Sequence, residues 1–360
     1  MAKAGEGAAF GRWRGATLAI GAAILFGAST PAAKVLLGKT DPWLLAAILY
    51  LGSGLGLFAL RILRRALAPD APRQTALHDK DWLWFSAAIL AGGVIGPVLL
   101  MIGLSRSSAA STSLMLNLES VATALVAWFI FRENFDRRIA FGMVAIAAGA
   151  VILSWQGTLG FESALGPLAI AGACLAWAID NNLTRKVSLS DPVQIAMLKG
   201  LVAGSINLAL ALWRGAASPG PGDFLAGAAI GLLGYGISLV MFVFALRAIG
   251  AARTGAYFAT SPFIGALVAF AVLGEPLTWQ VAFAGLLMAI GLWFHLTERH
   301  EHEHEHAPVV HEHRHSHDIH HAHAHGPGDP SGEPHAHRHA HTRLRHTHQH
   351  FPDPHHAHEH

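Results

Sequence analysis

The amino-acid sequence predicts an all-α polytopic membrane protein in which ten transmembrane helices form two inverted five-helix repeats. Three observations predict this fold class. The composition is 52% hydrophobic and only 13% charged, whereas a soluble domain carries roughly 25% charged residues. Apolar runs of about 20 residues, long enough to cross a bilayer, follow one another along most of the chain. Residues 109–133 also align without a gap with residues 251–275, so one span occurs twice.

The apolar runs define ten expected spans, separated by short segments that hold most of the charge. In chain order they cover residues 15–37, 43–61, 82–104, 109–131, 138–155, 163–183, 192–213, 223–246, 251–273 and 278–296. The first apolar run is too long for a cleaved signal peptide, so we expect it to be retained. The chain therefore divides into an N-terminal segment (1–14), two five-helix units (15–155 and 156–297) and a polar tail (298–360).

The positions of Lys and Arg predict the orientation, because cytoplasmic connections carry an excess of these residues. If the N-terminus lies inside, most Lys and Arg in the connections fall on the inner side, and only Lys39, Arg106 and Arg214 fall on the outer side. We therefore expect both termini in the cytoplasm and the protein in a bacterial inner (plasma) membrane.

A second pair of segments supports the duplication. Phe26–Pro42 resembles Trp177–Pro192, which aligns Lys34 with Arg185 and ends both segments at Asp-Pro. Since each unit holds five spans, an odd number, the second unit must be inverted relative to the first.

Glycines gather in the third and eighth spans, at Gly92, Gly93 and Gly96 before Pro97, and at 231–236 in the other unit. Glycine allows close helix packing and proline removes a backbone donor, so these segments are expected to be closely packed or kinked. The alternative is that they are ordinary glycines of membrane helices.

With two five-span halves, and with Glu133 and Glu275 ending the fourth and ninth spans, the chain resembles the drug/metabolite transporter superfamily in its EamA-like permease branch. The resemblance covers about residues 13–297 and leaves out the tail. It implies a central cavity between the halves, lined mainly by spans 1, 3, 4, 6, 8 and 9, and alternating access. Many members have Glu-Pro in the fourth span where this chain has Glu119-Ser120. Members handle amino acids, nucleotide sugars, drugs and other metabolites, so the substrate stays open.

Glu119 is the leading candidate for a functional residue, because a charge in hydrocarbon costs about 2.5–3.5 kcal/mol on insertion scales. It lies near the middle of the fourth span. A carboxyl group there can take up and release a proton during transport, or it can serve as a fixed hydrogen-bond partner between helices. Asn117 is two residues away, about 200° around the helix, so it need not face the same side.

Asp180 and Asn181 in the sixth span lie at a depth similar to that of Lys199 in the seventh. We expect an ion pair between Asp180 and Lys199, which either locks two helices together or binds a zwitterionic or anionic substrate. Trp177 and Tyr257 lie beside these polar positions, where they either stack on a ligand or pack in the core. Glu275 and Glu133 are expected to accept hydrogen bonds from loop donors, and Lys34, Arg185 and Arg253 to be structural.

The tail after residue 299 contains nearly all of the 25 histidines, interleaved with carboxylates. This chemistry suits Zn, Ni, Cu or Co ions, and the segment has too few apolar residues to build a core, so we expect disorder. The candidate metal ligands are His300, His302, His304, His306, His311, His313, His315 and His317.

Together these features predict a secondary active transporter that exports a small polar or amphipathic metabolite, driven by protons. The alternative is a transporter of Zn, Ni, Co or Cu ions, or a metal-regulated permease that uses the tail; a third hypothesis is a metal buffer or sensor without transport. We expect no catalytic residues, no required cofactor and no nucleic-acid partner, since no catalytic motif or basic stripe is present. The expected partners are a small-molecule substrate, the bilayer and, on the tail, metal ions. The oligomeric state stays open, a dimer included.

Overall fold

The computed structural model describes residues 2–67, 82–131, 137–155, 161–185, 191–249, 251–297, 301–306, 310–315, 335–340 and 344–349. The chain forms two compact units, Met1–Glu298 and Arg299–His360. Each unit is described by itself.

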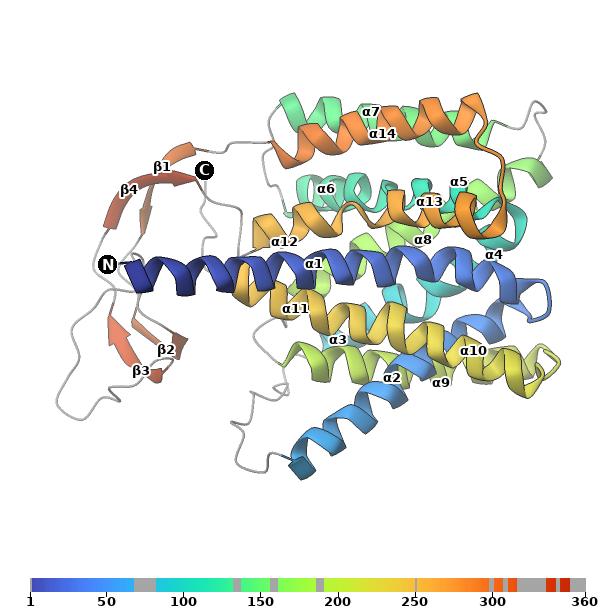
Figure 1. Ribbon diagram of the computed structural model, residues 1–360, viewed down its shortest axis with the longest axis horizontal. Helices are drawn as coiled ribbons and strands as arrows, with labels where there is room; N and C mark the ends of the chain where they lie inside the picture. The colour runs from blue at the N-terminus through green and yellow to red at the C-terminus, as the bar shows by residue number, and fades with distance from the viewer. Residues whose placement is uncertain are drawn as a thin grey trace. The chain divides into compact units, whose positions relative to one another are not determined.

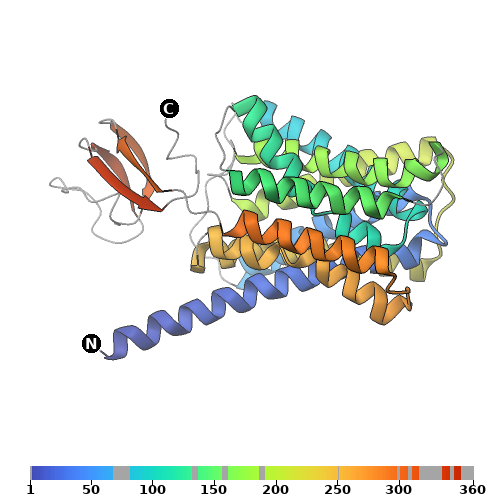
Figure 2. The same cartoon turned by 90° about the horizontal axis from the view of Figure 1, so that it is seen from above.

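The described part of the first unit is a bundle of helices that includes ten segments long and apolar enough to cross a membrane (Figures 1 and 2). This confirms the predicted ten-span, all-α membrane fold. Six spans are formed by one helix each: α1 (Ala2–Leu37), α2 (Pro42–Leu67), α7 (Arg137–Ser154), α8 (Phe161–Arg185), α9 (Pro192–Trp213) and α14 (Trp279–Leu296).

The other four spans are interrupted. The third consists of α3 (Trp82–Ala88), the π-helical segment η2 (Ile89–Ile95) and α4 (Gly96–Arg106), and the eighth of α10 (Pro221–Gly231), η3 (Leu232–Ile237) and α11 (Ser238–Ile249). The fourth is broken between α5 (Ala109–Met115) and α6 (Leu118–Phe131), and the ninth between α12 (Ala251–Phe258) and α13 (Ser261–Leu273). The glycine-rich segments expected to be kinked or closely packed are thus the π-helical ones.

Two pairs of equivalent spans from the two five-span halves pack against each other. The second span, α2, lies along the seventh, α9, and the fifth, α7, lies along the tenth, α14 (Figure 1). The first span also packs on the eighth and ninth, and the sixth packs on the third and fourth. This reciprocal pattern supports the duplication inferred from residues 109–133 and 251–275.

Glycines bring these paired helices into backbone contact. A Cβ atom on Gly200 of α9 would lie 2.7 Å from the backbone nitrogen of Gly54 on α2. A Cβ atom on Gly291 of α14 would lie 2.6 Å from the carbonyl oxygen of Gly142 on α7. Because lipid tails are as apolar as side chains, close van der Waals packing of this kind holds membrane helices together.

At one end of the bundle, two charged side chains satisfy the backbone where α4 ends and α5 begins. The Lys34 ammonium donates to the carbonyl oxygens of Leu104 (2.6 Å) and Ser107 (2.7 Å). The Glu275 carboxylate accepts from the amides of Ala109 (2.7 Å) and Ala110 (2.8 Å). Helix ends leave such groups without intrahelical partners, so the expected role of Glu275 as an acceptor for loop donors is confirmed. The equivalent Glu133 lies outside the described residues.

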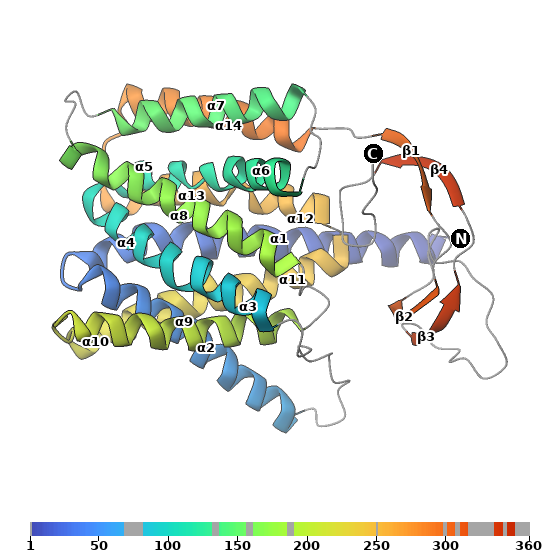
Figure 3. The ribbon, with the colours of Figure 1, turned by 180° about the vertical axis from the view of Figure 1, so that it is seen from behind.

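The described residues of the second unit form four short strands: β1 (Glu301–His306), β2 (Val310–His315), β3 (His335–Ala340) and β4 (Leu344–Gln349). Strand β1 pairs antiparallel with β4, and β2 with β3 (Figure 3). These strands cover only part of the tail, so the expectation that the tail is disordered stays a prediction. Alternation of His and Glu has a period of two residues, which is the period of a strand.

Candidate functional site

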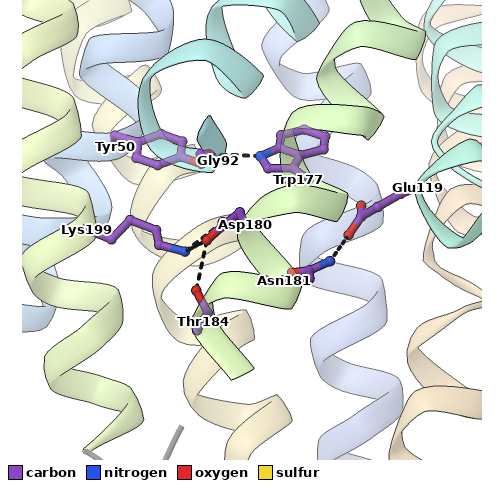
Figure 4. Close-up of polar contacts among 8 residues, drawn as sticks. All are labelled: Tyr50, Gly92, Glu119, Trp177, Asp180, Asn181, Thr184 and Lys199. Carbon is purple, nitrogen blue, oxygen red and sulfur yellow. Dashed lines mark hydrogen bonds and ion pairs between the residues drawn. The ribbon is translucent and has the colours of Figure 1, made fainter. Parts of the chain in front are cut away.

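Helix α8 presents two different faces. Leu168, Leu175 and Ile179 are exposed and lie within about 40° of one another at 100° per residue, so they form a stripe suited to lipid. Asp180 lies about 100° and Asn181 about 200° from Ile179 around the same helix. The polar side chains therefore point away from the apolar stripe, toward neighbouring helices (Figure 4).

Asp180 forms an ion pair with Lys199 of α9, as the sequence predicted. The ammonium nitrogen lies 2.7 Å from both carboxylate oxygens, and Thr184 donates a hydrogen bond of 2.9 Å to one of them (Figure 4). The Asp180 side chain is 7% exposed and that of Lys199 18%. Two charge-assisted hydrogen bonds offset the cost of keeping each charge out of water.

Glu119 and Asn181 form a second polar contact beside this pair. The Asn181 side-chain amide donates to a Glu119 carboxylate oxygen over 2.7 Å (Figure 4). Glu119 stands in the first turn of α6, directly after the break in the fourth span, and is half-buried. No cation pairs with it among the described residues, so this carboxyl group differs from Asp180 in having only a neutral partner there.

The π-helical turn of the third span lies against the ion pair. The Gly92 carbonyl accepts hydrogen bonds from the Tyr50 hydroxyl (2.8 Å) and the Trp177 indole (3.0 Å), and the Gly93 carbonyl accepts from Asn207 (3.1 Å). A side chain on Gly92 would collide with the Asp180 carboxylate. Helices α2, α8 and α9 thus fix the backbone next to Asp180, an arrangement typical of functional π-helical turns.

The other predicted site residues make no described hydrogen bond to Asp180, Lys199 or Glu119. Trp177 is buried and its indole N–H is bound to Gly92, so it supports the backbone instead of offering an open stacking surface. Asn117 is buried at the break in the fourth span, where it donates to Leu114 (2.8 Å) and lies 4.0 Å from the sulfur of Met288. Tyr257 is 38% exposed on α12, and no described contact joins it to the polar cluster.

Sequence reasoning missed Tyr50, Thr184 and Asn207. Thr184 had a signal, because it lies four residues after Asp180 and therefore on the same side of α8. For Tyr50 and Asn207 the sequence shows only a polar residue within an apolar run. Their partners are backbone carbonyls of another span, which the sequence does not identify.

The predicted metal ligands are untested by these contacts. Among the described residues, no three His, Cys, Asp or Glu side chains gather closely enough to hold a metal ion. His302, His304 and His306 lie in β1, and His311, His313 and His315 lie in β2, whose side chains are not described. His300 and His317 lie outside the described residues.

Comparisons with known proteins give consistent results. The sequence profile of the EamA-like transporter family matches residues 13–155 and 164–297. An uncharacterized transporter of Methanothermobacter thermautotrophicus is 30% identical over 301 residues, which cover 80% of this chain and 87% of that protein. An uncharacterized transporter of Archaeoglobus fulgidus is 24% identical over 275 residues, covering 74% of this chain and 92% of that one.

Two further matches support less, one because it covers a short part of the chain and the other because its sequence identity is low. A Pseudomonas fluorescens protein named "Probable 4-amino-4-deoxy-L-arabinose-phosphoundecaprenol flippase subunit ArnE" is 34% identical over 73 residues, which cover 20% of this chain and 61% of that protein. A crystal structure with a TM-score of 0.57 and 21% identity covers 78% of this chain and 95% of that chain. At this identity the crystal structure shows a likeness of fold alone.

Proposed function

This chain belongs to the EamA-like transporter family, and from that premise we propose that it exports a small polar or amphipathic metabolite by alternating access, coupled to protons. Membership makes it an integral membrane transporter with a small-molecule substrate. The substrate class, the direction of transport and the coupling ion are the proposed parts. The two five-helix halves are taken to be inverted repeats that rock about a central cavity.

The observation that carries the proposal is the neutral partner of Glu119. The hydrogen bond from Asn181 leaves the carboxylate with one negative charge and, among the described residues, no cation to balance it. A group in this position can bind a proton from one side of the membrane and release it to the other. Uptake of the proton removes the charge and weakens the hydrogen bond that Asn181 donates, which favours the state open to the other side.

Asp180 and Lys199 provide the proposed substrate contacts. An ammonium group has three N–H donors, and Asp180 accepts two of them. The third can bind an anionic group of the substrate, while the Asp180 carboxylate can bind a cationic group if the pair opens. A zwitterion or an anion fits this arrangement. The transition-metal alternative has no support among the described residues.

The proposed orientation follows from charge. In the sequence, Lys and Arg predominate in the connections on the side of the N-terminal segment, which supports a cytoplasmic location for both ends of the ten-span region in a plasma membrane. Export is the direction proposed for the substrate, with protons moving inward.

The test begins with a growth screen that compares deletion and overexpression strains across amino acids, toxic analogues and metals. The substrate found there is then loaded into proteoliposomes with an imposed pH gradient. We expect Glu119→Gln to lower the flux at least about tenfold and to abolish its dependence on the gradient. Asp223→Asn is the matched control and should keep both: this carboxylate lies at the end of the bundle, is 28% exposed and pairs with Lys39 over 3.8 Å. Unchanged flux and pH dependence in Glu119→Gln would refute the coupling role.

A further inference from the structure

A groove of about 510 Å³ lies between the last turns of α2, the first turn of α9 and α11. In Figures 1 and 3 the C-terminal end of α2 diverges from its neighbours at this point. The volume falls within the roughly 300–1,000 Å³ of pockets that bind small molecules. The groove is separate from the polar cluster around Asp180, none of whose residues lines it.

The walls of the groove are mostly apolar. Leu60, Leu63 and Leu67 of α2 face Val240 and Phe244 of α11. The three leucines and Phe244 are exposed, although they belong to segments that cross the membrane. Such a surface suits hydrocarbon, so acyl chains are the natural occupants of its deeper part.

Two arginines give the same groove a positive charge. Arg61 and Arg64 both line it, in the last two turns of α2, and neither forms an ion pair within the part of the chain that the structure describes. The acidic residue of the groove, Asp191, is engaged differently, because its carboxylate accepts a hydrogen bond from the amide of Val193 at the start of α9. The two guanidinium groups are therefore available to an anion.

We propose that this groove binds an anionic phospholipid, whose phosphate lies between Arg61 and Arg64 and whose acyl chain lies against the leucines. Guanidinium groups bind phosphate through two parallel hydrogen bonds. The groove therefore matches both parts of a phospholipid. Its arginines near the helix end suit the phosphate, and its apolar walls within the membrane suit the acyl chain. By the charge-based orientation this end lies in the cytoplasmic leaflet, which is the anionic one.

The experiment is native mass spectrometry of the full-length protein, released from detergent and titrated with phosphatidylglycerol or with phosphatidylcholine of the same acyl chains. We expect wild-type protein to retain phosphatidylglycerol at least about tenfold more tightly than phosphatidylcholine, and the double variant Arg61→Gln/Arg64→Gln to lose that preference. Arg65→Gln is the control: it removes one positive charge from the turn that holds Arg64, but Arg65 does not line the groove.

A second variant tests the groove without altering charge. Leu60→Trp fills the groove from a partly exposed position, and it should weaken retention of phosphatidylglycerol while the protein still elutes as a single species. Equal losses in Arg65→Gln and in the double arginine variant would overturn the proposal. So would unchanged retention in Leu60→Trp, or competition by glycerol 3-phosphate as strong as competition by the intact lipid, because either result would leave the apolar walls without a role.

Discussion

Removal of either charged side chain of the Asp180–Lys199 pair should strongly lower the free energy of unfolding of the bundle. Each is largely buried, and each neutralises the other. We predict that Lys199→Met lowers the free energy of unfolding by about 3–5 kcal/mol, because Asp180 would keep a buried charge without its partner. The double variant Asp180→Asn/Lys199→Met should recover most of the loss. Reversible unfolding of the purified protein in mixed micelles measures both.

Lys39→Met is the control for that comparison. Lys39 pairs with Asp223 over 3.8 Å, and its side chain is 70% exposed. A surface pair of this kind contributes about 0–1 kcal/mol, so its loss should change the stability little. Equal effects of Lys39→Met and Lys199→Met would contradict the assigned importance of the buried pair.

Sequence reasoning identified the charged residues of the site but not the groups that surround them. Asp180 and Lys199 could be paired because both stand at a similar depth, and charges in hydrocarbon need partners. The roles of Tyr50 and Trp177 depend on which carbonyl the π-helical turn directs at them, and composition does not specify that. Asn117 lies in the break between α5 and α6 and against Met288, which agrees with the expectation that it need not face the same side as Glu119.

At the scale of helices, glycine decides how closely the second and seventh spans approach. We predict that Gly200→Ala lowers the free energy of unfolding by about 1–3 kcal/mol, because its methyl group would meet the Gly54 backbone of α2 and force the helices apart. Gly255→Ala on α12 is the control, since nothing lies within 4 Å of the added carbon. Unfolding in mixed micelles distinguishes the two variants, and a cost in Gly255→Ala as large as in Gly200→Ala would contradict this packing.

Interrupted helices could be predicted only in part. Clustered glycines marked the third and eighth spans, and the structure has π-helical turns there. Clustered glycines indicate close helix packing or a kink, and they do not distinguish a π-helical turn from a kink. The break after Met115 had no local signal, since no proline interrupts that span. It could have been inferred from the aligned ninth span, which has Pro262 at the start of α13.

For the whole molecule, hydropathy was sufficient to predict the number and order of the spans. Backbone groups in lipid must be satisfied within the segment, so a long apolar run in a chain of this kind is a helix. The packing of the second span on the seventh and of the fifth on the tenth was not predicted, because the sequence does not specify which helix faces meet. The strands of the tail were not predicted, since the same residues also suit a chain without a core.

The polar side of α8 should line the proposed central cavity between the two halves, and single-cysteine labelling tests this central claim most directly. Cys174 is the only cysteine, so Cys174→Ala gives a background without thiols. In that background, a charged, membrane-impermeant methanethiosulfonate should modify Asn181→Cys at least about tenfold faster than Leu175→Cys, because thiols react as thiolates and these form in water. Equal rates, or an Asn181→Cys that stays unmodified from both sides of the membrane, would contradict the account.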